Sequence, residues 1–243
     1  MAEEKQSISI DIKNLTKQYG EQKALNNVSL SVNEGEIVGL LGPNGAGKST
    51  MMKILTCFIP LTSGQVTVCG YDVNEEPMKI RSIIGYLPEQ NPLYNELYVR
   101  EDLEFVAGIH GLRGKERKER VDFMIEKVGL QKEVKKKIGM LSKGYKQRVG
   151  IAQALIHDPK ILILDEPTTG LDPNQLIEIR SLIKELGRNK TVILSTHIMQ
   201  EVEAVCNRAV IINNGNLVAD DTVEALSEGQ TLEKKFREIT MNV

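Results

Sequence analysis

Residues 42–50 read Gly-Pro-Asn-Gly-Ala-Gly-Lys-Ser-Thr. They fit G-x-x-x-x-G-K-S/T, the pattern of the phosphate-binding P-loop. The glycines of this loop let the main chain curl so that successive N–H groups point inward as an anion nest. We expect Lys48 to reach the β- and γ-phosphates of a nucleoside triphosphate and the Ser49 hydroxyl to be a Mg²⁺ ligand. The predicted nucleotide-binding residues are Gly42, Pro43, Asn44, Gly45, Ala46, Gly47, Lys48, Ser49 and Thr50.

The flanks of the loop predict a strand before it and a helix after it. Residues 37–41, Ile-Val-Gly-Leu-Leu, form a short apolar run, as expected for a buried parallel strand. Beyond the loop, apolar side chains at positions 51, 52, 54 and 55 recur at helical spacing. In such a unit the positive end of the helix dipole faces the phosphate. A chance match in a glycine-containing turn would lack these flanks.

Composition and charge exclude several classes of protein. The 243 residues suit one large domain or two packed lobes, and the net charge of −2 gives no indication of nucleic-acid binding. The apolar runs are too short to span a membrane, and no apolar segment of a secretory signal follows the first five residues. The three cysteines, Cys57, Cys69 and Cys206, fit neither a disulfide framework nor a zinc site, which favours reduced thiols in the cytoplasm.

Periodicity along the chain predicts strands at both ends of the sequence and helices in the middle. Apolar residues alternate with polar ones at Ile8, Ile10 and Ile12, at Val28, Leu30 and Val32, and at Val66 and Val68. This alternation predicts an antiparallel layer. Residues from about 95 to 157 are rich in charge and carry apolar residues at helical spacing, as in a helical insert.

The second half of the chain predicts two buried strands and a helix between them. The strands are residues 161–164 and 192–194. The helix opens at Asp172-Pro173, where a capping side chain precedes a proline in the first turn. Residues 213–216, Asn-Asn-Gly-Asn, predict a hairpin turn.

Two acids close the first of these strands. Residues 161–166 read Ile-Leu-Ile-Leu-Asp-Glu, and the carboxyl edge of an α/β sheet is where ligands bind. Asp165 is suited to hold a Mg²⁺ shell opposite Ser49, and Glu166 lies where a carboxylate polarises an attacking water. Acids at strand ends are common, so this pattern gains its weight from the P-loop upstream.

Two further motifs resemble those of ABC-type ATPases. Residues 141–148, Leu-Ser-Lys-Gly-Tyr-Lys-Gln-Arg, resemble the LSGGQxQR signature, and Ser195-Thr196-His197 resembles the segment with the switch histidine. P-loop, signature, acidic strand, the Gly-Leu-Asp turn at 170–172 and the histidine follow in the order of that family. The resemblance covers residues 8–220.

The resemblance implies an α/β fold with a P-loop NTPase core of the ABC type, an antiparallel β lobe and an inserted helical subdomain. In this division residues 1–243 form a single ABC ATPase domain. Residues 1–90 and 158–243 make the α/β core with its β lobe, and residues 91–157 make the helical subdomain that carries the signature.

The resemblance also implies roles for individual residues. Glu166 and His197 are the catalytic residues, with the metal held by Ser49, Asp165 and Glu89. Tyr19 is at the position of an aromatic residue that stacks on adenine, although a half-buried tyrosine at a strand end is the alternative interpretation. The signature residues contact the γ-phosphate bound by a second subunit, and Asp172 couples the two sites across that dimer. These signature residues are Leu141, Ser142, Lys143, Gly144 and Tyr145.

The chain departs from the common family pattern in two motifs. Lys143 stands where the signature usually has glycine, and Tyr145 where it has glutamine. This variant is similar to that of the ABC-2-type exporter branch, which includes the ATPase component of the bacterial gliding-motility system. In the Q-loop, Tyr-Leu-Pro at 86–88 is followed by Glu89 in the glutamine's position, with Gln90 one residue later. The register favours Glu89, which could ligate Mg²⁺, but both residues stay candidates for ATP binding.

The function implied is an ATP-binding and ATP-hydrolysing subunit of an ABC transporter. Its ligands are ATP and Mg²⁺, and its partners are integral membrane permease subunits and a second copy or paired ATPase subunit, with no nucleic acid. It is expected in the cytoplasm, on the inner face of the cell membrane. The alternatives are a soluble ABC ATPase acting on DNA or ribosomes, which usually has a long coiled coil or two ATPase units, and a nucleotide-binding regulator without turnover.

Overall fold

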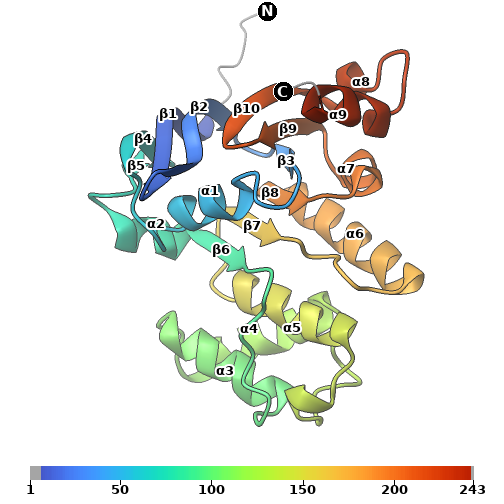
Figure 1. The fold of residues 1–243 in the computed structure, drawn as a ribbon. Helices are drawn as coiled ribbons and strands as arrows, with labels where there is room; N and C mark the ends of the chain where they lie inside the picture. The colour runs from blue at the N-terminus through green and yellow to red at the C-terminus, as the bar shows by residue number, and fades with distance from the viewer. Residues whose placement is uncertain (1–6, 242–243) are drawn as a thin grey trace, which may run out of the picture.

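The computed structural model describes residues 7–241, so the N-terminal segment considered for a secretory signal lies outside the described residues. Within this range the chain forms a six-stranded sheet of order β10-β9-β3-β8-β7-β6 and a four-stranded sheet of order β2-β1-β4-β5. In Figure 1 the smaller sheet lies at the upper left, and helices α3, α4 and α5 lie at the bottom.

The strands are β1 (Ile8–Tyr19), β2 (Gln22–Asn33), β3 (Ile37–Leu41), β4 (Ser63–Val68), β5 (Tyr71–Asp72), β6 (Ile84–Leu87), β7 (Ile161–Asp165), β8 (Thr191–Thr196), β9 (Arg208–Asn213) and β10 (Asn216–Thr222). The helices are α1 (Lys48–Leu55), α2 (Pro77–Ile83), α3 (Val99–Ile109), α4 (Gly114–Lys127), the 3₁₀ turn η1 (Ile138–Met140), α5 (Lys143–Leu155), α6 (Pro173–Gly187), α7 (Met199–Val205), α8 (Val223–Leu226) and α9 (Leu232–Met241). None of the helices between residues 7 and 241 has the length and hydropathy needed to cross a bilayer.

The larger sheet is parallel except at one edge. Strands β9, β3, β8, β7 and β6 run in the same direction, and β10 returns antiparallel to β9. The turn between β9 and β10 consists of Asn214 and Gly215, with φ values of 48° and 77°. Two positive φ values are those of a two-residue type I′ hairpin, so the predicted turn at 213–216 is confirmed.

The parallel strands are buried on both faces, and their side chains divide between two cores. In β7, Leu162 and Leu164 pack with the helices, whereas Ile161 and Ile163 pack with α1 and the antiparallel sheet. The same period of two holds along β3, β8 and β9. Continuous apolar runs in the sequence therefore correspond to strands that lie between two packed layers.

The predicted antiparallel layer is confirmed, with one local difference. Ile10 and Ile12 are buried against β2 and β4, but Ile8 is 50% exposed. The pairing of β1 with β2 shifts register between Ile8 and Ile10, and Ser9 is buried instead. A bulge of this kind inserts one residue and moves the preceding side chain off the buried face.

The helical segment between β6 and β7 packs on the helix-facing core. Its apolar spacing is confirmed, because Val121, Met124 and Ile125 of α4 and Leu103 of α3 are all buried. Arg120 of α4 donates to the carbonyl oxygens of Leu155 and Ile156 at the end of α5, at 2.7 and 2.8 Å. These bonds satisfy carbonyls that the helix itself leaves free.

Two histidines stack where this segment meets the sheet. The rings of His110 and His157 are parallel, with centroids 3.8 Å apart, and the Nε2 atom of His157 donates to the Ile84 carbonyl at 3.0 Å. Burial, and then the neighbouring His110, lower the pKa of His157 from 6.5 to about 4. The pair is therefore neutral at pH 7.

We expect His157 to make the protein less stable in mild acid. Between pH 6.5 and about 4 the unfolded chain binds a proton at this residue that the folded chain does not, so the free energy of unfolding falls as the pH falls. His157→Phe keeps an aromatic ring and removes this titration. In urea unfolding across that pH range, the free energy of unfolding of the variant should depend less on pH than that of the wild type. The lost hydrogen bond to Ile84 lowers this free energy by the same amount at every pH and does not affect the slope. Parallel curves for the two proteins would contradict this assignment.

Candidate nucleotide-binding site

The P-loop follows β3 directly, and close packing explains two of its glycines. A Cβ atom at Gly42 would lie 2.3 Å from the carbonyl oxygen of Ile212, and one at Gly47 would lie 2.5 Å from that of Ala24. Gly47 also has a φ of 114° and precedes the first residue of α1. The loop therefore needs glycine for space as well as for curvature.

The hairpin turn between β9 and β10 supports the loop from behind. Gly215 donates its N–H to the carbonyl of Ala46 at 2.9 Å and accepts from the N–H of Asn26 at 2.8 Å. Because a trans peptide directs its C=O and N–H to opposite sides, this bond turns the N–H of Gly47 away from the hairpin. The sequence predicted the turn that contains Gly215 but not its contact with the P-loop, because the two segments are far apart in the chain.

Lys48 is buried at the start of α1. Its Nζ donates to the carbonyl oxygens of Gly42 at 2.7 Å and Pro43 at 3.1 Å. Burial lowers the pKa of Lys48, while the nearby carboxylates of Glu166 and Asp165 oppose that shift. The ammonium group is held by neutral carbonyls, so negatively charged oxygens entering the loop would be stronger acceptors.

Asp165 at the end of β7 meets the P-loop across the sheet. Its Oδ1 accepts from the Ser49 hydroxyl at 3.3 Å and from the Ser195 hydroxyl at the end of β8. Ser195 Oγ also accepts from the backbone N–H of Glu166 at 3.0 Å. Ser195 thus ties both acids to the neighbouring strand. Its position before His197 was visible in the sequence, but its role depends on the pairing of β7 with β8.

Glu166 is held by residues from two further segments. His197 Nδ1 lies 3.0 Å from both carboxylate oxygens, and the Thr169 hydroxyl donates to Oε2 at 3.0 Å. The backbone of Glu166 has a φ of 51°, a conformation that costs about 1–2 kcal/mol for a residue with a Cβ. A buried carboxylate fixed in a strained conformation is typical of a functional site. Thr169 was not anticipated from the sequence.

The loop, Glu166 and His197 line one pocket of about 450 Å³. Glu89 lines this pocket and also an adjacent one of about 610 Å³, which Gln90, Ser49 and Asp165 line as well. The residues of the first pocket are Asn44, Gly45, Ala46, Gly47, Lys48, Ser49, Thr50, Glu89, Glu166, Thr169 and His197.

Other predicted site residues lie elsewhere on the described chain. Tyr19 is 51% exposed at the end of β1, with the ammonium of Lys17 4.9 Å from its ring centroid, and it does not line the P-loop pocket. Gly144, Tyr145 and Asp172 line a separate pocket of about 260 Å³. Within one chain, the signature and the P-loop therefore do not share a pocket.

Two helix caps lie near that separate pocket, and the one at Asp172 confirms the prediction from the sequence. Ser142 is the N-cap of α5, which begins at Lys143, and its hydroxyl accepts from the N–H of Tyr145. Asp172 caps α6 by accepting from the N–H groups of Asn174 and Gln175 at 3.0 Å. Each cap satisfies orphan donors and fixes where its helix starts.

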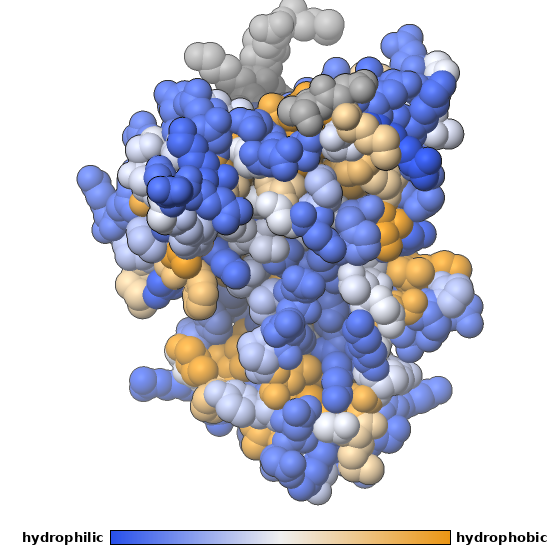
Figure 2. Space-filling view, in the orientation of Figure 1, coloured by the Kyte–Doolittle hydropathy of each residue, from blue (hydrophilic) through white to orange (hydrophobic). Residues whose placement is uncertain are grey.

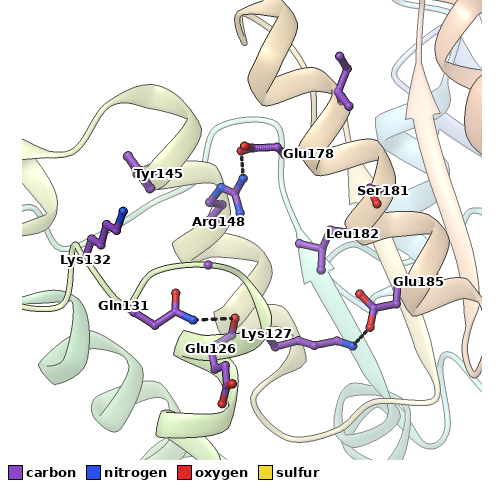
Figure 3. Close-up of a pocket in the computed structure, with 12 residues that line it drawn as sticks. Glu126, Lys127, Gln131, Lys132, Tyr145, Arg148, Glu178, Ser181, Leu182 and Glu185 are labelled. Carbon is purple, nitrogen blue, oxygen red and sulfur yellow. Dashed lines mark hydrogen bonds and ion pairs between the residues drawn. The ribbon is translucent and has the colours of Figure 1, made fainter.

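A cleft of about 820 Å³ separates the helical segment from α6 (Figure 3). Two ion pairs cross it, Lys127 with Glu185 and Arg148 with Glu178. Arg148 also donates to the Val128 carbonyl at 2.6 Å. The signature helix is therefore tied to α6 through charged side chains that remain partly exposed.

A family model described as "ABC transporter" matches residues 25–169, more than half of the chain. The chain belongs to the ABC transporter family. It is 40% identical over 221 residues to the uncharacterized ABC transporter ATP-binding protein YxlF of Bacillus subtilis (strain 168), covering 91% of this chain and 73% of that protein. It is 42% identical over 216 residues to the bacitracin transport ATP-binding protein BcrA of Bacillus licheniformis, with coverage of 88% and 70%.

Solved ABC structures have the same fold. An ATP-binding subunit of an ABC transporter superposes with a TM-score of 0.85 at 31% identity, over 95% of this chain and 98% of that one. The ATP-binding cassette MJ0796, in a dimeric post-hydrolysis state bound to ADP and Pi, superposes with a TM-score of 0.81 at 32% identity, over 88% of this chain and 98% of that one. The chain is thus an ABC ATP-binding subunit with ATPase activity, and the expected fold class is confirmed.

We expect Gly47→Ala to destabilise the ABC domain more than an alanine at an open glycine. The added Cβ would meet the Ala24 carbonyl, so the free energy of unfolding should fall by about 2 kcal/mol or more. Gly35 is the matched control, because its φ is 79° and no atom lies within 4 Å of the added Cβ. Gly35→Ala should cost only about 1–2 kcal/mol for the left-handed backbone, and urea unfolding measures both. Equal losses would mean that the packing against Ala24 is unimportant.

Proposed function

We propose that this protein is the ATPase of an ABC-2-type exporter and hydrolyses ATP through Glu166 and His197. The observation that carries the proposal is the clamp on Glu166, whose carboxylate is fixed by His197 and Thr169 inside the P-loop pocket. Glu166 acts as the general base on the attacking water, and His197 stabilises the charge that develops on the γ-phosphate.

The chemistry follows from the state of each group. An ionised Glu166 only accepts hydrogen bonds, so Nδ1 of His197 carries the proton shared with it. With Nδ1 protonated, Nε2 of a neutral ring accepts from water, and Nε2 donates to a phosphate oxygen when the ring is an imidazolium ion. Lys48 exchanges its two loop carbonyls for phosphate oxygens when ATP is bound. Catalysis is then positioning and charge stabilisation rather than covalent chemistry.

The oxygen donors beside the P-loop fit a bound Mg²⁺. Ser49 and Asp165 already share a hydrogen bond, and Glu89 lines the pocket of about 610 Å³ with both of them. Among residues 7–241 no cluster of three or more acidic, histidine or cysteine ligands could hold a metal alone. That matches Mg²⁺, which typically takes one or two carboxylates and completes its shell with water and phosphate oxygens. When bound, it neutralises phosphate charge.

Two chains are needed for a complete site in this proposal. Ser142 and Gly144 lie at the N-terminus of α5, where Gly144 lines a different pocket from the P-loop of its own chain. A helix N-terminus attracts anions, so the signature residues 141–145 of one subunit would contact the γ-phosphate on the other. Asp172, beside Gly144, would couple the two sites. The dimeric MJ0796 relative supports this arrangement.

The membrane partner is proposed to dock on the helical side of the molecule. Figure 2 shows apolar side chains gathered over this lower part of the surface. Phe105, Ile109 and Met140 are exposed there, and Phe58 lines the pocket beside Gln90. Exposed apolar groups of this kind mark interaction sites, so an integral permease that binds here would hold the subunit at the inner face of the membrane.

Relatives named for bacitracin transport and linearmycin resistance support export as the direction of transport.

We expect Glu166→Gln to bind ATP and remain as an ATP-bound dimer. The amide keeps the shape of the side chain but cannot accept the proton of water, so kcat should fall by about 10²-fold or more. Size-exclusion chromatography with ATP and Mg²⁺ should show a dimer for the variant and mainly a monomer for the wild type after turnover.

Lys48→Ala is the companion variant, because it should lose ATP binding and remain monomeric with ATP. Full turnover by Glu166→Gln would remove Glu166 from the mechanism. If Glu166→Gln bound ATP without hydrolysing it and stayed monomeric, this would argue against an active site shared between two chains.

We expect Glu89, and not Gln90, to act in ATP hydrolysis. Glu89 lines the P-loop pocket, so Glu89→Ala should lower kcat by about ten-fold, whereas Gln90→Ala should stay within about two-fold of the wild type. Steady-state ATPase assays at saturating ATP measure both, and the two variants are controls for each other. The reverse pattern would assign the Q-loop role to Gln90.

A further inference from the structure

A turn of only two residues connects β8 to α7, and His197 is in it. Thr196 is the last residue of β8, and α7 begins at Met199 with Ile198 as its N-cap. Ile198 has no side chain that can cap the helix, so the start of α7 must be fixed in another way.

The hydroxyl of Thr196 fixes this turn. It accepts from the backbone N–H of Ile198 at 3.1 Å and donates to Oε2 of Glu201 at 2.6 Å. Thr196 is fully buried, so water cannot replace either bond. The two bonds span His197 on both sides in the sequence and set the direction in which its ring leaves the backbone.

Glu201 is an unusual acceptor, because it is a carboxylate that is only 1% exposed. Among residues 7–241 its Oε1 has no hydrogen-bond partner, and the guanidinium of Arg180 on α6 is 4.0 Å away. A buried carboxylate with one oxygen unsatisfied costs free energy, and an apolar side chain would serve packing better. Stability alone therefore does not account for a glutamate here.

The alternation of side chains along β8 separates this network from the P-loop pocket. Ser195 points to Asp165 and Glu166, whereas Thr196 points to the opposite face, toward α7. Thr196 and Glu201 thus do not line the pocket with His197. Any effect on hydrolysis would have to pass through the turn.

We infer that Thr196 and Glu201 are positioning residues, which hold the turn at 196–198 so that His197 meets the carboxylate of Glu166. The inference rests on the proposed role of His197 in hydrolysis. Oε2 of Glu201 accepts a hydrogen bond from the Thr196 hydroxyl. The lone pairs of that hydroxyl are then free to accept from the N–H of Ile198. The histidine is then preorganised at 3.0 Å from Glu166 before ATP arrives.

Thr196→Val tests the inference, because valine has the shape of threonine without the hydroxyl. We expect kcat for ATP to fall by about ten-fold, less than the 10²–10⁴-fold of a lost general base, since His197 is still present. The KM for ATP should change by less than about two-fold, because the P-loop is untouched. Thr196→Ser restores the hydroxyl and should recover wild-type kcat.

Thr191→Val is the matched control at the other end of β8. Thr191 is almost as buried as Thr196, and its hydroxyl bonds the hydroxyl of Ser9 and the backbone N–H of Gly35, both at 3.0 Å. Its loss should also lower the melting temperature, but by less than Thr196→Val does, because the group left without a partner is a neutral hydroxyl and not a buried carboxylate, and it should leave kcat unchanged. An equal fall of kcat in both variants, or no fall in either, would overturn the inference.

Glu201→Leu separates positioning from stability. It replaces a half-satisfied buried carboxylate by an apolar side chain of similar size, so the melting temperature should stay or rise while kcat falls by about five-fold or more. Wild-type kcat in Glu201→Leu would overturn the role of Glu201.

His197→Ala in the same assay separates the two levels of the proposal. If it keeps full turnover, the proposed function of His197 fails. If it loses turnover while Thr196→Val and Glu201→Leu keep it, only the positioning inference fails.

Discussion

The register of the parallel sheet is the constraint on which the rest of the molecule depends. Leu41 pairs with Thr196, Asp165 with Ser195, and Leu87 with Leu164, so four strands end at one line. The P-loop, the two acids, the histidine turn and the Q-loop all leave the sheet from that line. A slip of one residue would send each core side chain to the wrong face, since these strands are packed on both sides. The apolar alternation between the two cores therefore fixes the site as well as the fold.

Patterns that are complete within a short stretch of sequence could be predicted. The P-loop with its flanks, the cap at Asp172, and the hairpin turn at Asn214-Gly215 depend on neighbours only a few residues away. Helix caps and hairpin turns need backbone conformations that only a few residue types favour. Those residue types in the sequence therefore indicate a cap or a turn. The period of two along the strands likewise follows from local geometry. These local patterns predicted the individual strands and helices, and the resemblance to ABC-type ATPases implied the fold class.

Most of the rest depends on partners that are distant in the chain. Gly215 supports Ala46 and Ser195 binds Asp165 across long stretches of sequence, whereas Thr169 reaches Glu166, three residues before it, only after the turn between them has formed. The turn with Gly215 and the segment with Ser195 stand out in the sequence, but nothing in the sequence shows which groups they bond. The sequence also gives no sign of the bulge that exposes Ile8, because apolar and polar residues keep alternating through it. A residue that makes a single hydrogen bond to a distant partner cannot be recognised from the sequence until the fold shows that partner.

The backbone of Glu166 shows how the fold supports a strained residue. Its N–H is shared between the carbonyl and the hydroxyl of Ser195, at 3.2 and 3.0 Å, while its carboxylate is bonded by two other segments. A left-handed conformation would relax if only one of these contacts existed, because a single hydrogen bond contributes about 1 kcal/mol and the strain costs as much. Several contacts from β8, from the turn after β7 and from His197 together exceed that strain. These contacts hold the carboxylate in place only while β7 and β8 keep their register. The packing that fixes the register of the sheet therefore also fixes the geometry of the proposed base.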